Sequence, residues 1–505
     1  MREISVGRLA KVVISFAAMI ALTLLCVGDG GTEKGVQGLA AQTPEEPPPN
    51  IVFVLTDDQF PGSEEHMPKL NAEIVSKGVE FENMTSTFPL CCPGRATIQR
   101  GQYVHNTKIY GNSPPAGGWE KFKSLKLHRS TVATWLNARD YQTGLFGKYM
   151  NNYREGGDPP PGWDRWYAWN GVDMGWRSVN DQGNEKPLEP QEADSLVARE
   201  ALGFLDTRLD NPAPVFAFVN FGAMHEPYHH AQADADKFRG VGVPRTPSFN
   251  EDDVSDKADF VRGLPRLSAS EISALDQGYR NGLRSLMRVD RFIGNAADLL
   301  RRKGEMGNTY LVFYTDNGSH FGQHRFEHGK LQPYEEDVNF PLFVRGPGIP
   351  PRVSQELVGN HDIAPTLADM GGAAVPPFAD GRTLLPLATG TITSLPRTAI
   401  LSEREVDAEP PNRWDMLRMW DEQEEKVMVY TRHEPPGAVK KEYYDLALDP
   451  HQLHNALGQS DTTYPPPALG TQQYYERRLN DLYGCGSGPE ATMTCRQAEN
   501  APLSP

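Results

Sequence analysis

Two apolar runs in the sequence end in pairs of side chains that could bind a metal ion. Asp57 and Asp58 follow the run IVFVL, and Asp316 and Asn317 follow the run TYLVFYT. Four oxygen ligands in two adjacent pairs suit a hard divalent cation, Ca²⁺ before Mg²⁺. Asp-Asp and Asp-Asn-Gly are also common in turns and caps, so either pair alone is more simply explained as a turn. The two pairs together keep both interpretations open.

Three further side chains could act on an anionic substrate. His225 follows a third apolar run, VFAFVNF, where it is either an ordinary loop histidine or a proton donor or acceptor. A lysine is usually a solvated charge. Lys148, between a glycine and a tyrosine at a predicted strand end, could instead reach a pocket, and Lys330 in FEHGKLQPYEED allows the same two interpretations.

The five cysteines divide into three groups. Cys26 lies in an apolar N-terminal run, and Cys485 and Cys495 bracket a short loop, so we expect the last two to pair in an oxidising compartment. Cys91 and Cys92 are adjacent in the sequence CCPGR and are left unpaired. Free thiols are unusual in an exported protein, so this doublet needs a chemical explanation.

The N-terminus is typical of an export signal. Basic residues precede the run VVISFAAMIALTLLCV, which has the length of a signal-peptide core and is short for a membrane span. We expect residues 1–41 to be a signal peptide and residues 42–49 a linker, with an uncleaved anchor or a lipoprotein as the alternative. The predicted location is therefore secreted or in the cell envelope.

Length and charge narrow the function classes. The chain has 505 residues and a net charge of −16, with 38% hydrophobic and 23% charged residues. This length suits one large domain and a smaller one. The negative charge argues against a broad nucleic-acid interface, which needs a basic face, but it allows a small cationic pocket.

The elements that must position these residues alternate between strands and helices, which predicts an α/β fold with a mostly parallel sheet. We predict strands at 51–55, 215–221 and 309–315, a long helix at 271–303, and another helix capped by Ser130. Ligands bind at the carboxyl ends of strands in open α/β sheets. The polar residues above should therefore meet at one edge.

The character of the sequence changes near residue 395. We predict a catalytic domain at 50–395 and a C-terminal α+β subdomain at 396–485, with a short antiparallel sheet and a polar helix ending near Leu482. Residues 486–505, with the Cys485–Cys495 loop, are expected to form a loose tail.

The combined motifs resemble the type I sulfatase family. Its signature is Cys-x-Pro-Ser-Arg, then three residues and usually Leu-Thr-Gly, and residues 91–101 read CCPGRATIQRG. The DDQ, GKY, His225, DNG and PLFVRGPGI segments follow in the family's order, and the resemblance covers roughly 49–460. Within the family, the CCP doublet and GQYVHN are most similar to N-acetylglucosamine-6-sulfatases and heparan 6-O-endosulfatases.

The resemblance implies an alkaline phosphatase-like fold and a modified active-site residue. Cys91 would be oxidised during export, by a formylglycine-generating enzyme, to Cα-formylglycine, whose hydrate is the nucleophile. One Ca²⁺ would be bound by Asp57, Asp58, Asp316 and Asn317 together with residue 91. The resemblance thus explains the cysteine doublet, with Cys92 as the variable, structural position.

The resemblance also gives roles to the cationic residues. Arg95 would hold the hydrate, and Lys148 and Lys330 would contact sulfate oxygens. His225 would contact sulfate or protonate the leaving alcohol. The implied substrate is a sulfated carbohydrate or an aryl sulfate, most specifically 6-O-sulfated N-acetylglucosamine in a glycosaminoglycan.

The chain departs from the family pattern at several positions. Gly94 replaces the usual serine, Gln99 and Arg100 replace Leu-Thr, and Met150 stands where many arylsulfatases have a histidine. The base that acts late in the reaction is therefore open, with His320 or Asn151 as weak candidates.

Three alternative functions remain. One is an arylsulfatase of broad specificity. Another is a phosphate or phosphonate monoester hydrolase of the same superfamily, which the cysteine signature disfavours. The third is a non-catalytic glycan-binding protein, which should have lost site residues that this chain retains.

Overall fold

The computed structural model describes residues 47–154, 157–171, 177–404, 413–434, 439–458, 462–489 and 491–504. The predicted signal peptide at 1–41 lies outside these residues, as does most of the linker. Everything below belongs to one unit, Pro47–Pro505. The boundaries predicted between catalytic domain, subdomain and tail within this unit stay a prediction.

The main sheet contains ten strands within the described residues, in the order β13-β2-β12-β9-β1-β8-β4-β5-β6-β7. The central pairs β9–β1, β1–β8, β8–β4 and β4–β5 are parallel, while β12 and the β6–β7 edge run antiparallel. The prediction of a mixed, mostly parallel sheet is confirmed. The strands are β1 (Asn50–Thr56), β2 (Val79–Phe81), β4 (Gln142–Gly147), β5 (Arg165–Asn170), β6 (Ser178–Asp181), β7 (Asn184–Pro187), β8 (Val215–Asn220), β9 (Thr309–Thr315), β12 (Leu342–Arg345) and β13 (Arg352–Ser354).

The three predicted strands form the centre of this sheet. Every residue of β1, β8 and β9 is buried, as expected for apolar, β-branched runs covered on both faces. In the register, Leu55 lies beside Asn220 and Thr56 beside Thr315. The residues that follow these strands therefore emerge together at one edge of the sheet.

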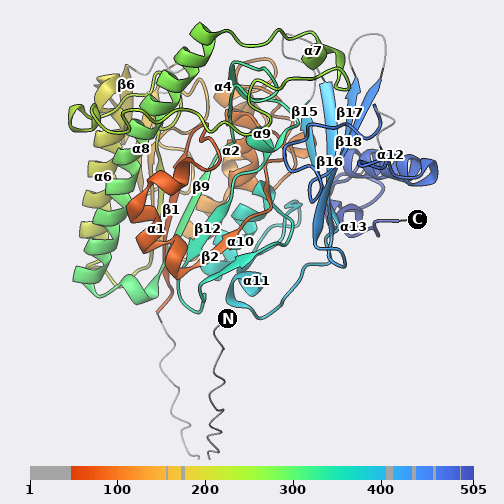
Figure 1. Cartoon of the computed structure of the whole chain (residues 1–505). Coiled ribbons are helices and arrows are strands. Elements are labelled where there is room, and N and C mark those ends of the chain that lie inside the picture. The colour runs from red at the N-terminus through yellow and green to blue at the C-terminus, as the bar shows by residue number, and fades with distance from the viewer. Residues whose placement is uncertain are drawn as a thin grey trace, which may run out of the picture. The chain divides into compact units, whose positions relative to one another are not determined.

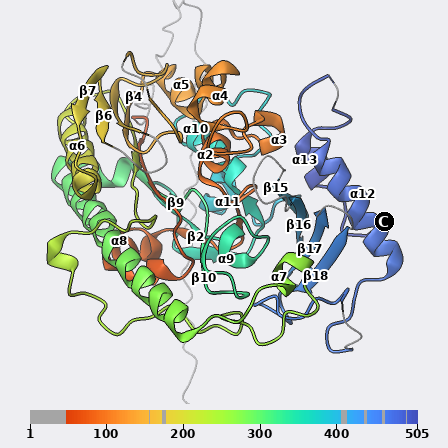
Figure 2. The same cartoon turned by 90° about the horizontal axis from the view of Figure 1, so that it is seen from above.

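Helices cover both faces of the sheet (Figures 1 and 2). On one face lie α1 (Pro68–Glu73), α6 (Ala193–Arg208) and α8 (Ala269–Lys303), and on the other lie α2 (Cys91–Arg100), α5 (Val132–Asn137) and α10 (Ile363–Met370). The shorter helices are α3 (Val104–Thr107), α4 (Gly118–Ser124), α7 (Asp259–Arg262), α9 (Glu335–Val338) and α11 (Leu385–Thr389).

The helix ends show where local sequence signals succeed and fail. The long predicted helix is α8, which starts at a capping box between Ser268 and Glu271 and ends at Gly304 in the left-handed conformation. The cap predicted at Ser130 is wrong, because Thr131 is the N-cap residue of α5 and its backbone amide donates to the Thr134 hydroxyl at 3.0 Å. The Ser130 hydroxyl instead accepts a hydrogen bond from the Trp135 indole at 3.0 Å.

The C-terminal region contains the predicted antiparallel sheet. Its strands are β15 (Ala399–Arg404), β16 (Arg413–Asp421), β17 (Lys426–Glu434) and β18 (Lys440–Asp445). Helix α12 (Leu469–Tyr483) is the polar helix expected near Leu482, and Cys485 and Cys495 form the expected disulfide. Four short strands complete the set of described strands: β3 (Met84–Thr85), β10 (His320–Phe321), β11 (His328–Gly329) and β14 (Val358–Gly359).

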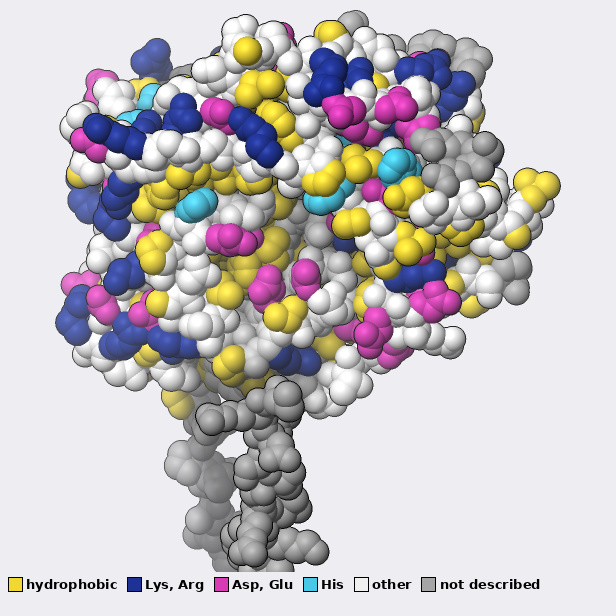
Figure 3. Space-filling model, in the orientation of Figure 1, with side chains coloured by type: hydrophobic (Ala, Val, Ile, Leu, Met, Phe, Trp, Pro, Cys, Tyr) yellow, Lys and Arg dark blue, Asp and Glu magenta, His cyan; other side chains and the backbone are white. Residues whose placement is uncertain are grey.

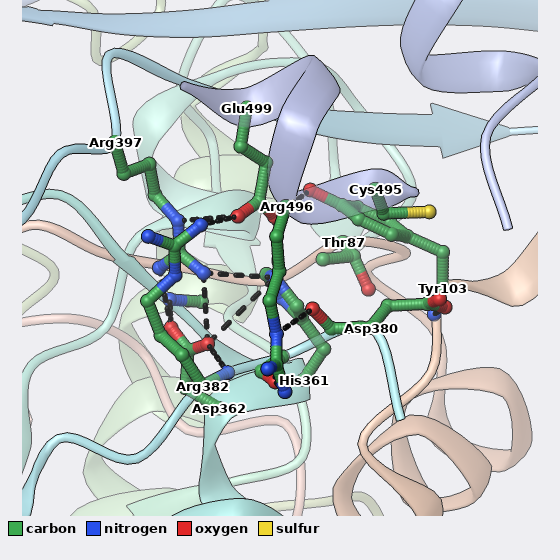
Figure 4. A network of polar contacts seen from close by, with 12 residues as sticks. Thr87, Tyr103, His361, Asp362, Asp380, Arg382, Arg397, Cys495, Arg496 and Glu499 are labelled. Atoms are coloured by element: carbon green, nitrogen blue, oxygen red, sulfur yellow. Dashed lines mark hydrogen bonds and ion pairs between the residues drawn. The ribbon is translucent and has the colours of Figure 1, made fainter. Parts of the chain in front are cut away.

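The expectation of a loose C-terminal tail is wrong. Helix α13 (Cys495–Glu499) ends in Glu499, whose side chain is fully buried. Its carboxylate contacts Arg397 Nε at 2.9 Å and His361 Nε2 at 2.8 Å, and accepts a hydrogen bond from the Tyr103 hydroxyl (Figure 4). The segment has few apolar residues, so hydrophobic patterning could not predict its burial. Ion pairing with distant residues, the Cys485–Cys495 disulfide and packing of Ala498 in an apolar cluster hold it in place.

The surface mixes both signs of charge. On the face drawn in Figure 3, basic and acidic side chains are interspersed. None of the helices among the described residues is long and apolar enough to cross a membrane.

Candidate active site

Helix α2 places Cys91 and Arg95 together at the edge where the central strands end. The two residues are four apart, so they share one helical face, and both are buried. Cys91 is the first residue of the helix, where the positive end of the helix dipole favours a negative ligand. Cys92 points elsewhere, with its sulfur 3.8 Å from Met150 Sδ in the core.

The four predicted oxygen ligands converge on Cys91. Its Sγ lies 3.7 Å from an oxygen of Asp57 and 3.9 Å from an oxygen of Asp58. Asp316 accepts a hydrogen bond from the Asp58 backbone at 3.2 Å, and the Asn317 amide donates to the Asp58 carboxylate at 2.7 Å. The turn interpretation alone does not require this convergence between segments more than 250 residues apart.

The predicted cationic residues surround these carboxylates. Arg95 Nε lies 2.8 Å from Asp316 Oδ2, and Lys148 forms an ion pair with Asp57. Lys330 pairs with Asp58 and also lies 2.8 Å from Cys91 Sγ. His225 Nε2 is 3.3 Å from Asp58, while its Nδ1 lies 2.7 Å from the Glu226 carbonyl oxygen. All nine residues predicted from the sequence thus meet in one site.

The electrostatics of the site favour ionised carboxylates. Burial opposes ionisation of Asp58, but Lys330 and His225 outweigh it and lower its pKa to about 2. Burial likewise opposes ionisation of Asp57, yet Lys148 and His225 lower its pKa. Two anionic carboxylates beside a third, Asp316, form an environment suited to cations.

An unmodified thiol at position 91 would be neutral. Burial raises the pKa of Cys91 to about 12, despite the opposing charges of Lys148 and Lys330. A thiol with such a pKa is protonated at neutral pH and is a weak nucleophile and a weak metal ligand. Burial raises the pKa of the neighbouring Cys92 to about 12 as well, so the shift reflects the depth of both thiols and does not by itself distinguish residue 91.

The donor set fits Ca²⁺. Asp57, Asp58, Asp316 and Asn317 offer hard oxygens. Asn317 Oδ1 is buried and accepts no hydrogen bond among the described residues, although buried polar atoms normally have partners. An oxygen left without a donor beside three carboxylates is what a hard cation would satisfy, so these four side chains could hold the ion together with residue 91.

The site opens to solvent on one side. The Lys148 side chain is only 3% exposed, whereas those of His225 and Lys330 are 21% and 14% exposed. A separate cavity of about 320 Å³ lies beside the His225 loop, lined by Glu226, Tyr228 and His328 among others. His225 and Lys330, as the more exposed side chains, mark the side from which a substrate could reach the site.

Sequence reasoning missed two residues that shape the site. Asn220, the last residue of β8, accepts a hydrogen bond from Arg95 Nη1 at 3.2 Å; a polar residue ending an apolar run was the available signal. Gly94 lies so close to the Asp316 backbone that a Cβ atom there would be 2.6 Å from its carbonyl oxygen. The glycine that departs from the family signature thus permits close packing of α2 on the Asp316 loop.

The two weak base candidates differ in their contacts. His320 Nδ1 lies 2.8 Å from Asp337, whereas the Asn151 side-chain oxygen is buried and has no hydrogen-bond partner among the described residues. Met150, which stands in place of a histidine, packs against Cys92.

Comparison with known proteins identifies the family. The model of the family described as Sulfatase matches residues 49–373, which is more than half of the chain. The chain belongs to the sulfatase family. A second model, described as N-sulphoglucosamine sulphohydrolase, C-terminal, matches residues 322–466 of this sulfatase.

Curated relatives cover the sulfatase to different extents. The human N-acetylglucosamine-6-sulfatase is 33% identical, covering 94% of this chain and 90% of the relative. The Volvox carteri arylsulfatase is 30% identical, covering 82% and 72% respectively. The matched region spans only 49% and 31% of the extracellular sulfatase homologs of Caenorhabditis elegans and Drosophila melanogaster.

Solved structures share the fold. One that is described as a complex with its substrate D-glucosamine-2-N,6-O-disulfate superposes with a TM-score of 0.72 at 21% identity, covering 86% of this chain and 97% of the other. A phosphonate monoester hydrolase from Silicibacter pomeroyi has a TM-score of 0.58 at 18% identity, covering 88% and 98%. These likenesses establish the alkaline phosphatase-like architecture expected from the sequence.

Proposed function

We propose that this sulfatase hydrolyses sulfate monoesters with a formylglycine hydrate at position 91 as the nucleophile. The observation that carries the proposal is the position of Cys91 Sγ, at the buried start of α2, between two carboxylates and the Lys330 ammonium group. The modified residue would supply two hydroxyls on one carbon, one to attack sulfur and one to lose a proton when sulfate is released.

The chain's own cations would bind and orient the sulfate group. Lys148, beside Asp57, and Lys330, beside Asp58, would neutralise negative charge on the sulfate oxygens. Arg95 is fixed by Asp316, by Asn220 and by the Lys148 carbonyl at 2.9 Å. Its role would be to fix the positions of residue 91 and the carboxylates relative to one another.

His225 would protonate the leaving alcohol. Its Nδ1 proton is donated to the Glu226 carbonyl, so Nε2 is the nitrogen that can exchange a proton with the substrate. Nε2 also lies on the more open side of the site, where the alcohol portion would be. Ca²⁺ bound by Asp57, Asp58, Asp316, Asn317 and residue 91 would acidify the attacking hydroxyl.

The proposed substrate is 6-O-sulfated N-acetylglucosamine in a glycosaminoglycan or a related sulfated glycan. Support comes from the relatives named N-acetylglucosamine-6-sulfatase and from the fold neighbour solved with D-glucosamine-2-N,6-O-disulfate. We further propose that the protein is exported by residues 1–41, is secreted or held in the cell envelope, and is modified by a formylglycine-generating enzyme during maturation.

Two measurements test the proposal. Mass spectrometry of the peptide containing residue 91 should show a loss of about 18 Da relative to cysteine; an intact thiol in fully active enzyme would overturn the mechanism. Initial rates on N-acetylglucosamine-6-sulfate, 4-nitrophenyl sulfate and 4-nitrophenyl phosphate should favour the sugar sulfate. Faster hydrolysis of the aryl sulfate would support the broad arylsulfatase, and faster hydrolysis of the phosphate ester would support the phosphatase alternative.

A further inference from the structure

The segment that carries Lys330 is held from both sides in the chain. On the N-terminal side, β10 and β11 pair antiparallel, with Phe321 opposite His328 and His320 opposite Gly329. On the C-terminal side, the Gln332 backbone donates to Asp337 at 2.7 Å. Between these two supports lie only Lys330 and Leu331.

Leu331 has a backbone conformation that leucine rarely adopts. Its φ is 76°, in the left-handed region that is costly for a residue with a Cβ atom. Such a conformation persists only where the surroundings impose it, and it is often found at functional sites. The contacts of Leu331 should therefore show what imposes it.

The contacts that fix Leu331 come from the C-terminal sheet. Its carbonyl oxygen accepts hydrogen bonds from Trp414 Nε1 at 3.0 Å and from Arg404 Nη1 at 3.2 Å. Arg404 on β15 and Trp414 on β16 lie directly opposite each other in the antiparallel register, so their side chains leave the same face of the sheet. Both side chains are buried, with exposures of 5% and 0%.

The donors are specific to this carbonyl and are firmly supported. The Trp414 ring belongs to a small apolar cluster with Val338, Met416 and Val429, so its N–H direction is set by packing. The residue whose carbonyl they bind directly follows Lys330, whose ammonium group lies 2.8 Å from Cys91 Sγ. A change in the Leu331 backbone would therefore move the Lys330 side chain.

We propose that Arg404 and Trp414 are positioning residues for Lys330, so that the C-terminal sheet completes the sulfate-binding site. This inference rests on the proposed function only in the role given to Lys330. The claim that the pair holds residues 328–332 in place stands on the geometry and can be tested without turnover.

The main test compares two indole deletions on the same strand. Trp414→Phe removes the N–H that binds Leu331, while Trp420→Phe removes an indole N–H that is buried without a partner among the described residues. Hydrogen exchange of residues 328–332 in the full chain should rise in Trp414→Phe and stay at the wild-type level in Trp420→Phe. Unchanged exchange in both variants would overturn the positioning role.

Kinetic constants sharpen the test. With N-acetylglucosamine-6-sulfate, Trp414→Phe should lose at least about tenfold in kcat/KM, and the inhibition constant for inorganic sulfate should rise, whereas Trp420→Phe should keep both values. Arg404→Met should act in the same direction. Equal loss of melting temperature in both tryptophan variants, with kinetics unchanged below it, would identify a purely structural residue and refute the proposal.

A second-site change provides the rescue. Glycine adopts a positive φ without the penalty that leucine has, so Leu331→Gly in the Trp414→Phe background should recover part of the lost kcat/KM. If kcat/KM does not recover in the double variant although the hydrogen exchange of residues 328–332 returns to the wild-type level, the catalytic defect has another cause and the proposal is contradicted. If wild-type enzyme hydrolyses no sulfate ester, the proposed function fails, and the exchange of residues 328–332 still decides the positioning claim.

Discussion

Two buried clusters of charged residues in this sulfatase contain similar side chains but have different roles. The active-site cluster comprises Asp57, Asp58, Cys91, Arg95, Lys148, His225, Asp316, Asn317 and Lys330. The C-terminal anchor comprises His361, Asp362, Arg382, Arg397 and Glu499 (Figure 4). Both mix carboxylates with cations, and most of these side chains are buried.

The clusters differ in how completely their oxygens are satisfied. In the anchor, each oxygen of Asp362 and of Glu499 accepts two hydrogen bonds, from arginines, His361, Tyr103 and backbone amides. In the active-site cluster, Asn317 Oδ1 accepts none among the described residues, and His225 and Lys330 reach solvent. Carboxylate oxygens that are fully hydrogen-bonded within the protein stabilise the fold, whereas an oxygen left without a donor in a partly open site is available to bind a ligand.

The largest effect should come from residue 91. Cys91→Ala should lower kcat by about 10⁴-fold or more, because the nucleophile is lost. Cys91→Ser should be inactive as well, because serine has no second hydroxyl on the same carbon whose deprotonation would release the sulfate. Initial rates on N-acetylglucosamine-6-sulfate measure this. Cys92→Ala is the matched control and should retain substantial activity; a dead Cys92→Ala beside an active Cys91→Ala would exchange the roles of the two sulfurs.

Removal of the metal should have the next largest effect, and it should affect the active-site cluster and not the C-terminal anchor. Exhaustive chelation should lower both activity and melting temperature, because an ion that binds only the folded protein stabilises it and this stabilisation is lost when the ion is removed. Activity assays and thermal melts with and without added Ca²⁺ measure both quantities. Asp316→Asn should weaken the response to Ca²⁺, while a change in the anchor should leave it intact. Indifference of the wild type to chelation would remove the metal assignment.

Most of the nine site residues could be predicted because they follow apolar runs of the kind that forms central strands. Asp57 and Asp316 follow two such runs, and parallel strands end at a shared edge. Cys91 and Arg95 were linked by the family signature, and helix α2 brings them together. The family resemblance then supplied the roles of these residues, which position alone did not.

The parts that could not be predicted depend on contacts between distant residues. Glu499 is buried because Arg397 and His361, more than 100 residues away, pair with it, and no local pattern around residue 499 indicates this. The close approach of Gly94 to Asp316 and the contacts of Arg404 and Trp414 with Leu331 are similar cases. Hydrophobic periodicity describes faces of elements, whereas these contacts depend on how the faces are assembled.

A substitution in the C-terminal anchor should lower the free energy of unfolding and leave the catalysed reaction unchanged. Glu499→Gln leaves Arg397 with half of its buried negative charge, so the free energy of unfolding should fall by about 3 kcal/mol. Denaturant titration measures the loss, and kcat/KM measured well below the melting temperature should stay at the wild-type value. Glu476→Gln on α12 weakens ion pairs with Arg432 and Lys441, whose side chains are 12% and 40% exposed, and should cost less than about 1 kcal/mol.

The Glu499→Gln variant should also reveal how the stability of the folded protein depends on pH. Burial opposes ionisation of Glu499, but Arg397 and His361 outweigh it and hold its pKa below the ordinary value. The stabilisation is therefore present above the unfolded pKa of about 4.3 and is lost as pH falls through the folded value. The difference in melting temperature between wild type and Glu499→Gln should shrink below pH ~4; a constant difference would contradict the ionised anchor.

A smaller effect should follow from the close packing of α2 against the Asp316 loop, which only the active-site cluster requires. Gly94→Ala adds a Cβ atom 2.6 Å from the Asp316 carbonyl oxygen, so α2 or the loop must move, at a cost of about 1–3 kcal/mol. Because Arg95 and Asp316 would separate, kcat/KM and Ca²⁺ affinity should fall together by about tenfold. Gly203→Ala is the control, since its Cβ would meet nothing within 4 Å inside α6. If Gly94→Ala or Gly94→Ser raised activity instead, the close packing of α2 against the Asp316 loop would not be required for catalysis. The active-site cluster would then tolerate larger shifts of its residues than the anchor does.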